Sequence, residues 1–435
     1  MGKKTIALVT NWYPTEENPY SGGFFREQAI AVKEHYDFIV IHYRENKSMK
    51  LAADYNLTRV KEEENIREYR IDVSVPRRVV LVERKEKLDM KLGIVKTDKP
   101  EGVGEIMPMC RKYFTKKMVG QIVQNEKELS FDALYCVDAQ SEAFVLKCFA
   151  ESAKKPYVVA EHAPIPWPGR VLNDANKDAI EKADLFLAIS HDKIRQSLLL
   201  NIKLPKTFYI GNLVDETQFL LKSENLDNAD DAIGASRDAE DENKKADEED
   251  GKTILTVGAN AFFKHYDLFI EAMNRLTEIT DKNFSVMVVG YAADEGYAKD
   301  REGFEAKIKN SKFADRVGLI PSVPHSEICN IYPMADVYVI TSIQEGQPVA
   351  VMEAACCGLP IFATRCGGVE DYVDDKMGRI YDVDDAEGIA SGLKDYLEGR
   401  LTFDPEYIRG QVINRFGKEA FVKNFVKAFD GVMEI

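Results

Sequence analysis

Short, nearly continuous apolar runs recur along the chain and are separated by stretches with helical periodicity. Runs of this kind are typical of buried parallel strands, because both faces of a parallel sheet are covered. The predicted strands are 5–9, 37–42, 133–137, 157–160, 184–190, 208–214, 253–257, 284–289, 316–320, 336–340 and 360–363. Strand, loop, helix and strand follow one another in both halves of the chain. This order predicts two doubly wound α/β domains.

Helical patterns occupy several of the segments between the predicted strands. The predicted helices are 25–32, 141–153, 268–276, 302–310, 325–333 and 419–433. In the last of these, Phe421, Phe425 and Phe429 recur at every fourth position and therefore share one stripe of the helix. We expect this stripe to make ordinary core contacts.

Residues 222–252 interrupt the α/β pattern. They contain 12 Asp or Glu and 5 Lys or Arg, with almost no aromatic or β-branched residues. Such a composition cannot bury enough apolar surface to fold, so it predicts a disordered acidic linker. The predicted organisation is an N-terminal Rossmann-like domain (1–221), the linker, and a C-terminal Rossmann-like domain (253–410). Residues 411–435 are predicted to form a helix that packs back toward the N-terminal domain.

Charge and cysteine content exclude several classes of protein. The formal net charge of −15 argues against general nucleic-acid binding. The seven cysteines are odd in number and show no C-x-x-C spacing, which favours reduced thiols and a cytoplasmic location. No window approaches 18 consecutive apolar residues, and the start MGKKTIALVT predicts a first strand better than a signal peptide.

One segment of this acidic chain is basic. Residues 77–117 carry 12 Lys or Arg against 6 Asp or Glu, with apolar residues interleaved. A solvated insertion with an exposed helix face explains this composition. A surface for anionic lipid, or for a phosphorylated acceptor, explains it as well. The second interpretation would place the protein peripherally at the inner face of the membrane.

The stretch from Thr341 to Val369 has the clearest chemistry. Glu345 and Glu353 are separated by seven residues that include Gly346, Gln347 and Pro348. Glycine permits a sharp turn and proline favours the first helical position, so Glu353 should lie about two turns into the helix that follows. The free N–H groups of the first turn, from Gly346 to Val349, would then face an anion. This arrangement suits a ligand that carries both phosphate and hydroxyl groups.

Two further candidates lie in the N-terminal half. Gly22 and Gly23 follow the first predicted strand, and their backbone N–H groups can approach a ligand closely. A simple loop is the alternative, because a lone Gly-Gly pair is a weak signal. His162 follows the strand 157–160, where open α/β sheets bind ligands, although an isolated histidine is often a packed core residue.

A metal site is not expected. No His or Cys cluster has the spacing of a zinc site. The stretch Asp382–Asp385 contains a D-x-D pattern, but it precedes a helix and is better explained as a group of N-cap residues.

The run from Ser342 to Pro360 reads SxxEGxPxxxxEAxxxGxP and resembles the E-x7-E segment of retaining glycosyltransferases of the family-4 type. The resemblance extends in order over both halves and leaves 44–130 and 222–252 as the main unmatched parts. Its other segments are Pro14 with Ser21–Gln28, Glu161-His162, 183–190, 212–219, Val257-Gly258 with Lys264, and 367–370.

The resemblance implies a GT-B fold, in which two Rossmann-like, doubly wound domains face each other across a cleft. It implies that 1–221 is the acceptor-side domain and that 253–410 binds the nucleotide sugar. It implies transfer of a sugar from a nucleoside-diphosphate sugar (UDP or GDP) to a glycan or lipid-linked acceptor, with retention and without metal or cofactor. Synthesis of cell-surface polysaccharide or glycoconjugate is the expected context. Two other enzymes on this fold, an epimerase and a phosphorylase, are the alternatives.

The resemblance also implies a role for each candidate residue. Glu353 would hold the ribose hydroxyls and Glu345 the hydroxyls of the donor sugar. Lys264 would contact the diphosphate, and His162 would border the sugar. The remaining donor-binding residues would be Gly22, Gly23, Asn260, Gly346, Gln347, Pro348 and Val349.

One position departs from the family pattern. Ala259 stands directly after Val257-Gly258, where the family normally has an arginine that contacts the diphosphate. The neighbouring Asn260 supplies only hydrogen bonds, and His265 would substitute in part. This departure motivates a non-enzymatic alternative, in which the chain is a catalytically degenerate binding or scaffolding subunit.

Overall fold

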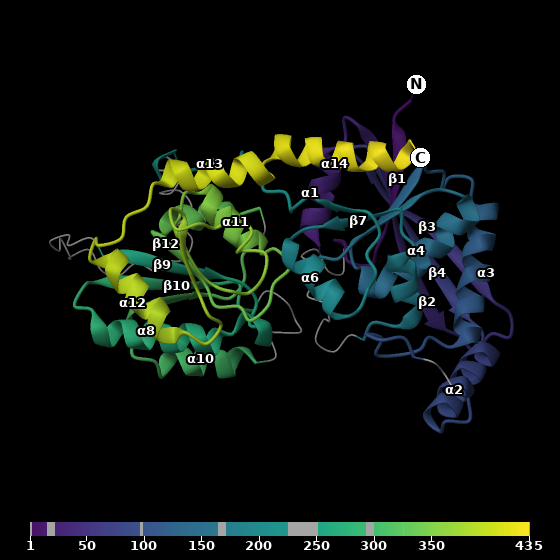
Figure 1. The fold of residues 1–435 in the computed structure, drawn as a ribbon, viewed down its shortest axis with the longest axis horizontal. Helices are drawn as coiled ribbons and strands as arrows, with labels where there is room; N and C mark the ends of the chain where they lie inside the picture. The colour runs from purple at the N-terminus through teal and green to yellow at the C-terminus, as the bar shows by residue number, and fades with distance from the viewer. Residues whose placement is uncertain are drawn as a thin grey trace. The chain divides into compact units, whose positions relative to one another are not determined.

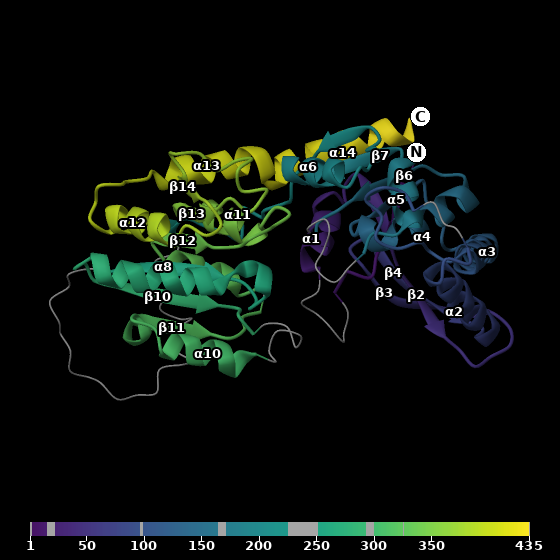
Figure 2. The same cartoon turned by 60° about the horizontal axis from the view of Figure 1, so that its bottom comes forward.

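The computed structural model describes residues 2–14, 22–95, 99–163, 171–224, 251–292, 300–324 and 326–434. The chain forms two compact units, drawn in Figures 1 and 2. The N-terminal unit comprises Met1–Gly211 and Phe421–Ile435, and the C-terminal unit comprises Asn212–Ala420. Most of the predicted acidic linker, 225–250, lies outside the described residues.

The N-terminal unit is built on a mostly parallel eight-stranded sheet with the order β3-β4-β2-β1-β5-β6-β7-β8. The strands are β1 (Lys4–Val9), β2 (Tyr36–Lys47), β3 (Asp54–Glu63), β4 (Ile66–Val75), β5 (Ala133–Cys136), β6 (Tyr157–Ala160), β7 (Leu185–Ala188) and β8 (Thr207–Tyr209). The central strand β1 pairs in parallel with β2 and β5, and Ile6 and Ala7 are fully buried there. The apolar runs therefore form the parallel core that the sequence predicts.

Helices cover this sheet. They are α1 (Gly23–Ala31), α2 (Arg77–Lys91), α3 (Met109–Asn125), α4 (Ala139–Ala153), α5 (Asp174–Glu181), α6 (His191–Leu199) and most of α14 (Lys418–Met433). The predicted phenylalanine stripe on α14 is confirmed, because Phe421, Phe425 and Phe429 are all buried. The ring of Phe429 lies 6.3 Å from Tyr36 on β2 and 5.7 Å from Tyr135 on β5.

The sequence pattern did not predict β3 and β4. They form an antiparallel hairpin whose turn residues, Glu64 and Asn65, both have positive φ angles. Such turns usually contain Asn-Gly or Asp-Gly, so Glu-Asn gives little signal. Strand β3 lies at the sheet edge, is largely exposed and is rich in charge, as edge strands often are.

The C-terminal unit contains a fully parallel six-stranded sheet with the order β11-β10-β9-β12-β13-β14. The strands are β9 (Lys252–Val257), β10 (Phe284–Val289), β11 (Val317–Ile320), β12 (Val337–Ile340), β13 (Ile361–Thr364) and β14 (Gly378–Tyr381). The helices are α8 (Tyr266–Ile279), α10 (Arg301–Lys309), α11 (Val349–Cys356), α12 (Ala386–Leu397) and α13 (Pro405–Phe416). Strand β12 is buried throughout, which agrees with its continuous apolar sequence.

The predicted helix 325–333 is wrong. The described part of this segment contains only two 3₁₀ turns, Ile328–Asn330 and Tyr332–Met334. Pro333 lies in the second turn and cannot donate the backbone hydrogen bond that a continuing α-helix would need there. Within the described ranges, no helix is both long enough and apolar enough to span a bilayer.

Candidate active site

The sheet of the C-terminal unit reverses its strand order between β9 and β12. In open α/β sheets, ligands bind beside the carboxyl ends of the strands at this switch point. The segments that leave these two strands are 258–265 and 341–348, so both emerge at the same edge. The topology thus explains why candidate residues far apart in sequence meet.

Lys264 and Glu345 form an ion pair at this edge. The Lys264 Nζ atom lies 2.7 Å from Glu345 Oε1, and Ser342 Oγ donates to the same oxygen at 2.7 Å. Both charged side chains are largely buried, at 18% and 11% exposure. The hydroxyl of Thr341 also donates to the backbone carbonyl of Lys264 at 3.1 Å. The two loops are therefore joined by side-chain and backbone contacts, and two predicted catalytic residues lie together.

The loop after β13 fixes the turn at Gly346. A Cβ atom on Gly368 would lie 2.3 Å from the Gly346 carbonyl oxygen, and Gly368 has a φ of +73°. Only glycine permits both this close approach and this backbone conformation. The backbone N–H of Glu345 also donates to the Cys366 carbonyl at 2.6 Å. The turn before α11 is consequently held from a third loop.

The start of α11 has the features of an anion site. Helix α11 begins at Val349, with Pro348 as its N-cap, no side-chain cap and no acidic residue in the first turn. The prediction that Pro348 is the first helical residue is therefore wrong by one position. The first-turn N–H groups and the positive end of the helix dipole favour a negative ligand group.

Glu353 lies in the second turn of α11, closer to the helix start than the predicted two turns. Its side chain is buried, and Tyr332 donates its hydroxyl to Glu353 Oε2 at 2.6 Å. Burial and the charge of Glu353 hold the pKa of Tyr332 well above its usual value, so the phenol stays a neutral donor. Sequence reasoning missed Tyr332, because no pattern marks a residue in a short 3₁₀ turn.

Gln347 and Asn260, two further predicted donor-binding residues, make contacts other than the Lys264–Glu345 ion pair. The Gln347 side chain accepts from the backbone N–H of Asn212 at 2.5 Å, and its carbonyl accepts from the Asn212 amide at 3.0 Å. Asn260 lines a cavity of about 290 Å³ together with His265 and Lys307. Gln347 therefore anchors residue 212 through both its side chain and its backbone carbonyl.

In the N-terminal unit, the structure brings Gly22, Gly23 and His162 together. The His162 ring, on the segment after β6, lies 4.7 Å from Phe25 in an edge-on contact and 5.7 Å from Phe24. Gly22 is the N-cap of α1, and a Cβ atom there would lie 2.5 Å from the Trp12 carbonyl. Gly22 thus has a structural role. A Cβ atom on Gly23 would have no other atom within 4 Å. Ser21 and Pro164 lie outside the described residues.

Glu161 is a buried residue of this region that the sequence analysis named only as part of a matching segment, without a role. Its carboxyl accepts from the backbone N–H groups of Gln140 at 2.9 Å and Ala163 at 2.8 Å. Burial, and then the charge of Asp138, raises its pKa, while Lys193 acts in the opposite sense. These bonds fix the backbone directly after His162 and tie this segment to the start of α4.

The comparison with protein families agrees with this geometry. A model described as "Glycosyl transferases group 1" matches residues 237–410. That segment, which contains Lys264, Glu345 and Glu353, is similar to this family. It is 28% identical over 152 residues to the gpi3 subunit of phosphatidylinositol N-acetylglucosaminyltransferase from Schizosaccharomyces pombe, which covers 34% of this chain and 32% of that protein. It is 30% identical over 135 residues to D-inositol 3-phosphate glycosyltransferase of Thermobifida fusca. This match covers 30% of this chain and 31% of that protein. The chain thus spans about a third of the length of each of these relatives.

Solved structures match the whole chain. Sucrose-phosphate synthase from Thermosynechococcus elongatus is similar with a TM-score of 0.68 and 15% identity, over 99% of this chain and 100% of the other. Anabaena Alr3699/HepE in complex with UDP and glucose is similar with a TM-score of 0.63 and 14% identity, over 98% and 100%. At this identity the likeness establishes fold, and it confirms the predicted GT-B class.

In the C-terminal unit, the loop that contains Ala259 is fixed by backbone bonds. Gly258 donates its N–H to Val289 at 2.9 Å, and Asn260 donates to Tyr291 at 2.9 Å. Ala259 brings no charge, so the positive side chain that the structure supplies on this loop beside Glu345 is Lys264.

The D-x-D pattern at 382–385 has a structural explanation. The Asp385 carboxylate accepts from the backbone N–H of Gly388 at 2.7 Å and so caps α12. The predicted N-cap role is confirmed for this residue. Among the residues that the structure describes, no group of three or more His, Cys, Asp or Glu side chains is arranged to hold a metal ion.

Proposed function

We propose that the chain is a retaining glycosyltransferase that moves a sugar from a UDP or GDP sugar to a glycan or glycolipid acceptor. The observation that carries the proposal is the Lys264–Glu345 pair at the switch point of the C-terminal unit. The uncapped start of α11 follows directly, with Glu353 in its second turn. Together these groups offer a cation, a helix N-terminus and two carboxylates to one ligand.

The chemistry of the donor fits each group. Negative charge grows on the diphosphate as the bond from the anomeric carbon to the phosphate oxygen breaks, and Lys264 with the N–H groups at Gly346–Val349 stabilises it. Glu353 accepts from the ribose hydroxyls and Glu345 from the sugar hydroxyls. The acceptor oxygen then bonds to the same face of the anomeric carbon, and its proton passes to the departing phosphate. For the N-terminal unit, we propose that Gly23 and His162 contribute.

The donor is tested by incubating the protein with UDP-, GDP- and ADP-sugars, with and without acceptor. We expect nucleotide release from one donor class that acceptor accelerates. An epimerase would instead produce an isomeric nucleotide sugar, and a degenerate subunit would bind the donor without releasing nucleotide. Failure to bind any nucleotide sugar would contradict the transferase proposal.

The acceptor panel is guided by the printed names of the relatives. Two of them act on inositol-bearing compounds by name, phosphatidylinositol and D-inositol 3-phosphate. We therefore include an inositol-bearing acceptor among the glycans and glycolipids tested. The seven cysteines are all free thiols, which supports a cytoplasmic location for the proposed reaction.

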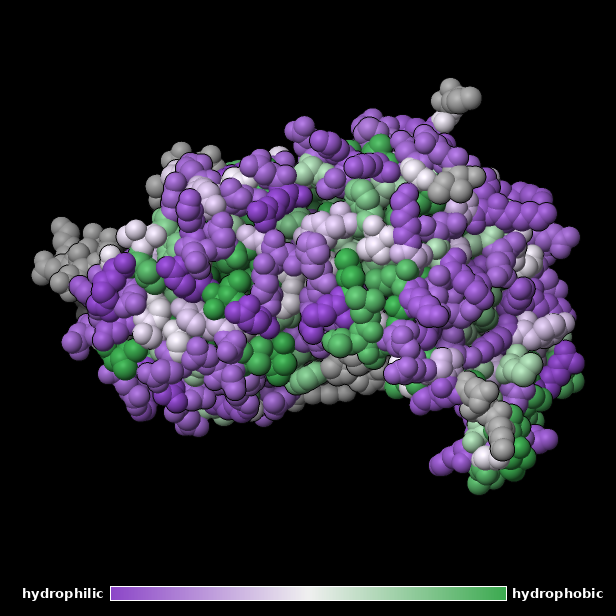
Figure 3. All heavy atoms as spheres, viewed as in Figure 1, coloured by the Kyte–Doolittle hydropathy of each residue, from purple (hydrophilic) through white to green (hydrophobic). Residues whose placement is uncertain are grey.

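Helix α2 supports peripheral contact with an anionic membrane. The helix contains no buried residue, and Leu81 and Leu88 are 51% and 53% exposed. Arg84 and Lys85 are exposed between these leucines in sequence, whereas Glu83 is turned to Arg111 of α3. Figure 3 shows hydrophobic and hydrophilic side chains mixed around this helix, at the lower right of the view. We propose that apolar insertion and basic charge act together on this face.

The membrane proposal predicts a charge-dependent loss of binding. The double change Arg84→Glu and Lys85→Glu should weaken co-sedimentation with phosphatidylserine-containing vesicles by at least about 10-fold, since each basic residue contributes roughly 1 kcal/mol. Added salt should weaken binding of the unaltered protein in the same assay. Lys309→Glu, an exposed change on α10, is the matched control and should have no effect. Binding that is indifferent to salt would contradict the proposal.

A further inference from the structure

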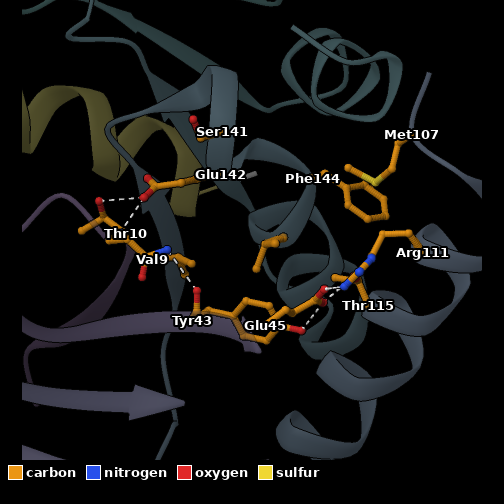
Figure 4. Close-up of a pocket in the computed structure, with 12 residues that line it drawn as sticks. Val9, Thr10, Tyr43, Glu45, Met107, Arg111, Thr115, Ser141, Glu142 and Phe144 are labelled. Atoms are coloured by element: carbon orange, nitrogen blue, oxygen red, sulfur yellow. Dashed lines mark hydrogen bonds and ion pairs between the residues drawn. The ribbon is translucent and has the colours of Figure 1, made fainter. Parts of the chain in front are cut away.

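The N-terminal unit contains a cavity of about 220 Å³ that none of the predicted site residues line (Figure 4). It is bounded by the carboxyl end of β1, the distal part of β2, and helices α3 and α4. The strand order of this unit reverses between β1 and β5, and α4 follows β5 directly. The cavity therefore lies at the switch point, where open α/β sheets place their ligands.

Glu142 of α4 lines this cavity with a carboxyl that is only half satisfied. One oxygen, Oε1, accepts from the Thr10 hydroxyl at 3.0 Å and from the Asn11 backbone N–H at 2.6 Å. The other oxygen, Oε2, is buried and has no hydrogen-bond partner among the described residues. Water cannot readily reach it, because the residue is only 6% exposed. A buried polar atom without a partner is costly, so a ligand that bonds to it gains affinity.

The protonation of Glu142 decides which ligand atom it can bind. Burial, and then the charge of Asp138, holds the pKa of this carboxyl well above its usual value. The neutral acid carries one O–H, and its second oxygen already accepts two bonds, so the O–H is directed from Oε2. It suits an oxygen acceptor such as a hydroxyl group.

The one cation of the cavity lining is already neutralised. Arg111 Nη1 lies 2.5 Å from Glu45, and its Nη2 lies 2.5 Å from Glu83. Glu45 is fixed in turn by the hydroxyls of Tyr43 at 2.8 Å and Thr115 at 2.6 Å. Two carboxylates against one guanidinium leave no excess positive charge for a phosphate. The cavity therefore favours an uncharged ligand.

The size and the walls of the cavity point to a single ring. Its volume is below the roughly 300–1,000 Å³ of sites for drug-sized ligands. Apolar atoms come from Val9, Phe144 and Val145, while Asn11 and Ser141 add polar groups. An apolar wall with polar groups at its edge matches the faces and the hydroxyl-bearing rim of a sugar or cyclic polyol.

We propose that this cavity binds an uncharged polyhydroxylated ring of the acceptor, a sugar or cyclitol, with Glu142 Oε2 bonded to one of its hydroxyls. The proposal rests on the proposed transferase function, since it assigns the ring to the acceptor. Any phosphate on the acceptor lies outside the cavity. The substitution Glu142→Gln preserves this arrangement, because its oxygen can accept from Thr10 and Asn11 while its amide donates to the ligand.

The experiment measures ring binding and donor binding separately. Binding of myo-inositol and of glucose to the full chain is followed by ligand-observed NMR without donor, and UDP- and GDP-sugar binding by calorimetry. Glu142→Leu should weaken ring binding by about 10-fold or more, since it removes a buried bond, and should leave donor affinity unchanged. Glu142→Gln should stay within about threefold of the unaltered protein, the range of a conserved hydrogen bond.

A second variant changes an exposed residue, so its effect does not depend on whether the protein folds with a substitution in its core. Ser141→Phe changes an exposed residue of the cavity lining and should block ring binding by filling the space. Equal losses for Glu142→Gln and Glu142→Leu would reduce Glu142 to a structural role and overturn the proposal. So would ring binding that survives both Glu142→Leu and Ser141→Phe. If no nucleotide sugar binds, the proposed transferase function is wrong. The measurement of ring binding still tests the cavity proposal in that case, because it is made without donor.

Discussion

Replacing Glu353 with alanine is expected to weaken nucleotide-sugar binding by about 100-fold or more, because two charge-assisted hydrogen bonds to the ribose are lost. The carboxylate is buried and its Oε2 atom is oriented by Tyr332 at 2.6 Å, so water cannot easily replace it. Isothermal titration with UDP- and GDP-sugars measures the effect. An unchanged affinity would contradict the assignment of Glu353.

Tyr332 provides the control for this prediction. Glu353→Ala leaves the buried Tyr332 hydroxyl without its acceptor, which by itself costs about 1–3 kcal/mol of stability. Tyr332→Phe keeps the carboxylate but removes its orienting bond, and should weaken binding by only about 3- to 10-fold, the value of one neutral bond. The double variant removes the unpaired hydroxyl. If Glu353 contacts the ligand, donor affinity should be lost in Glu353→Ala and in the double variant and largely kept in Tyr332→Phe. This pattern would show that the loss comes from the missing carboxylate and not from reduced stability.

Replacing Lys264 with methionine is expected to lower kcat by about 100- to 1,000-fold, the usual range for a group that stabilises developing negative charge. The effect should be large here because Ala259 brings no second cation to the same loop. Steady-state release of nucleotide in the presence of acceptor measures it. Lys309→Met, an exposed change on α10, is the matched control and should retain activity.

Glu345 complicates the Lys264 variant, and a further variant resolves it. Removing Lys264 leaves Glu345 largely buried without its cation, which destabilises the loop. Lys264→Met combined with Glu345→Gln relieves that charge. Lys264→Arg keeps a cation and should recover part of kcat. A kcat within about threefold of the unaltered protein in Lys264→Met would exclude a role in leaving-group stabilisation.

Burial was the easiest property to predict from the sequence. Strands such as β5 and β12 are apolar throughout and buried throughout, so pattern and outcome agree. The β3–β4 hairpin was missed because its strands alternate weakly and carry charge on an exposed edge. The helix predicted at 325–333 is absent from the described residues of this segment, because Pro333 cannot donate the backbone hydrogen bond that a continuing helix needs.

The candidate site was predicted as a set of residues but not as a set of contacts. Glu345 was identified from its spacing to Glu353 and Lys264 from the family resemblance, and the parallel topology explains why the two side chains meet. Tyr332 and Glu142 carry no local signal, because their importance comes from what packs against them. Glu142 in particular lies on a helix next to an exposed serine, and only the tertiary structure shows that its carboxyl is enclosed.

Helix α14 has a consequence for how the protein is made. Phe425 and Phe429 belong to the N-terminal unit and contact Tyr36, Phe38 and Tyr135 of its sheet. The residues of Met1–Gly211 therefore leave the ribosome with this aromatic surface uncovered, and it stays so until the C-terminal unit has also been synthesised. Domains usually fold as they emerge, and exposed apolar surface in that interval promotes aggregation. The N-terminal unit thus cannot complete its core during translation, and chaperone demand should last for the synthesis of the whole chain.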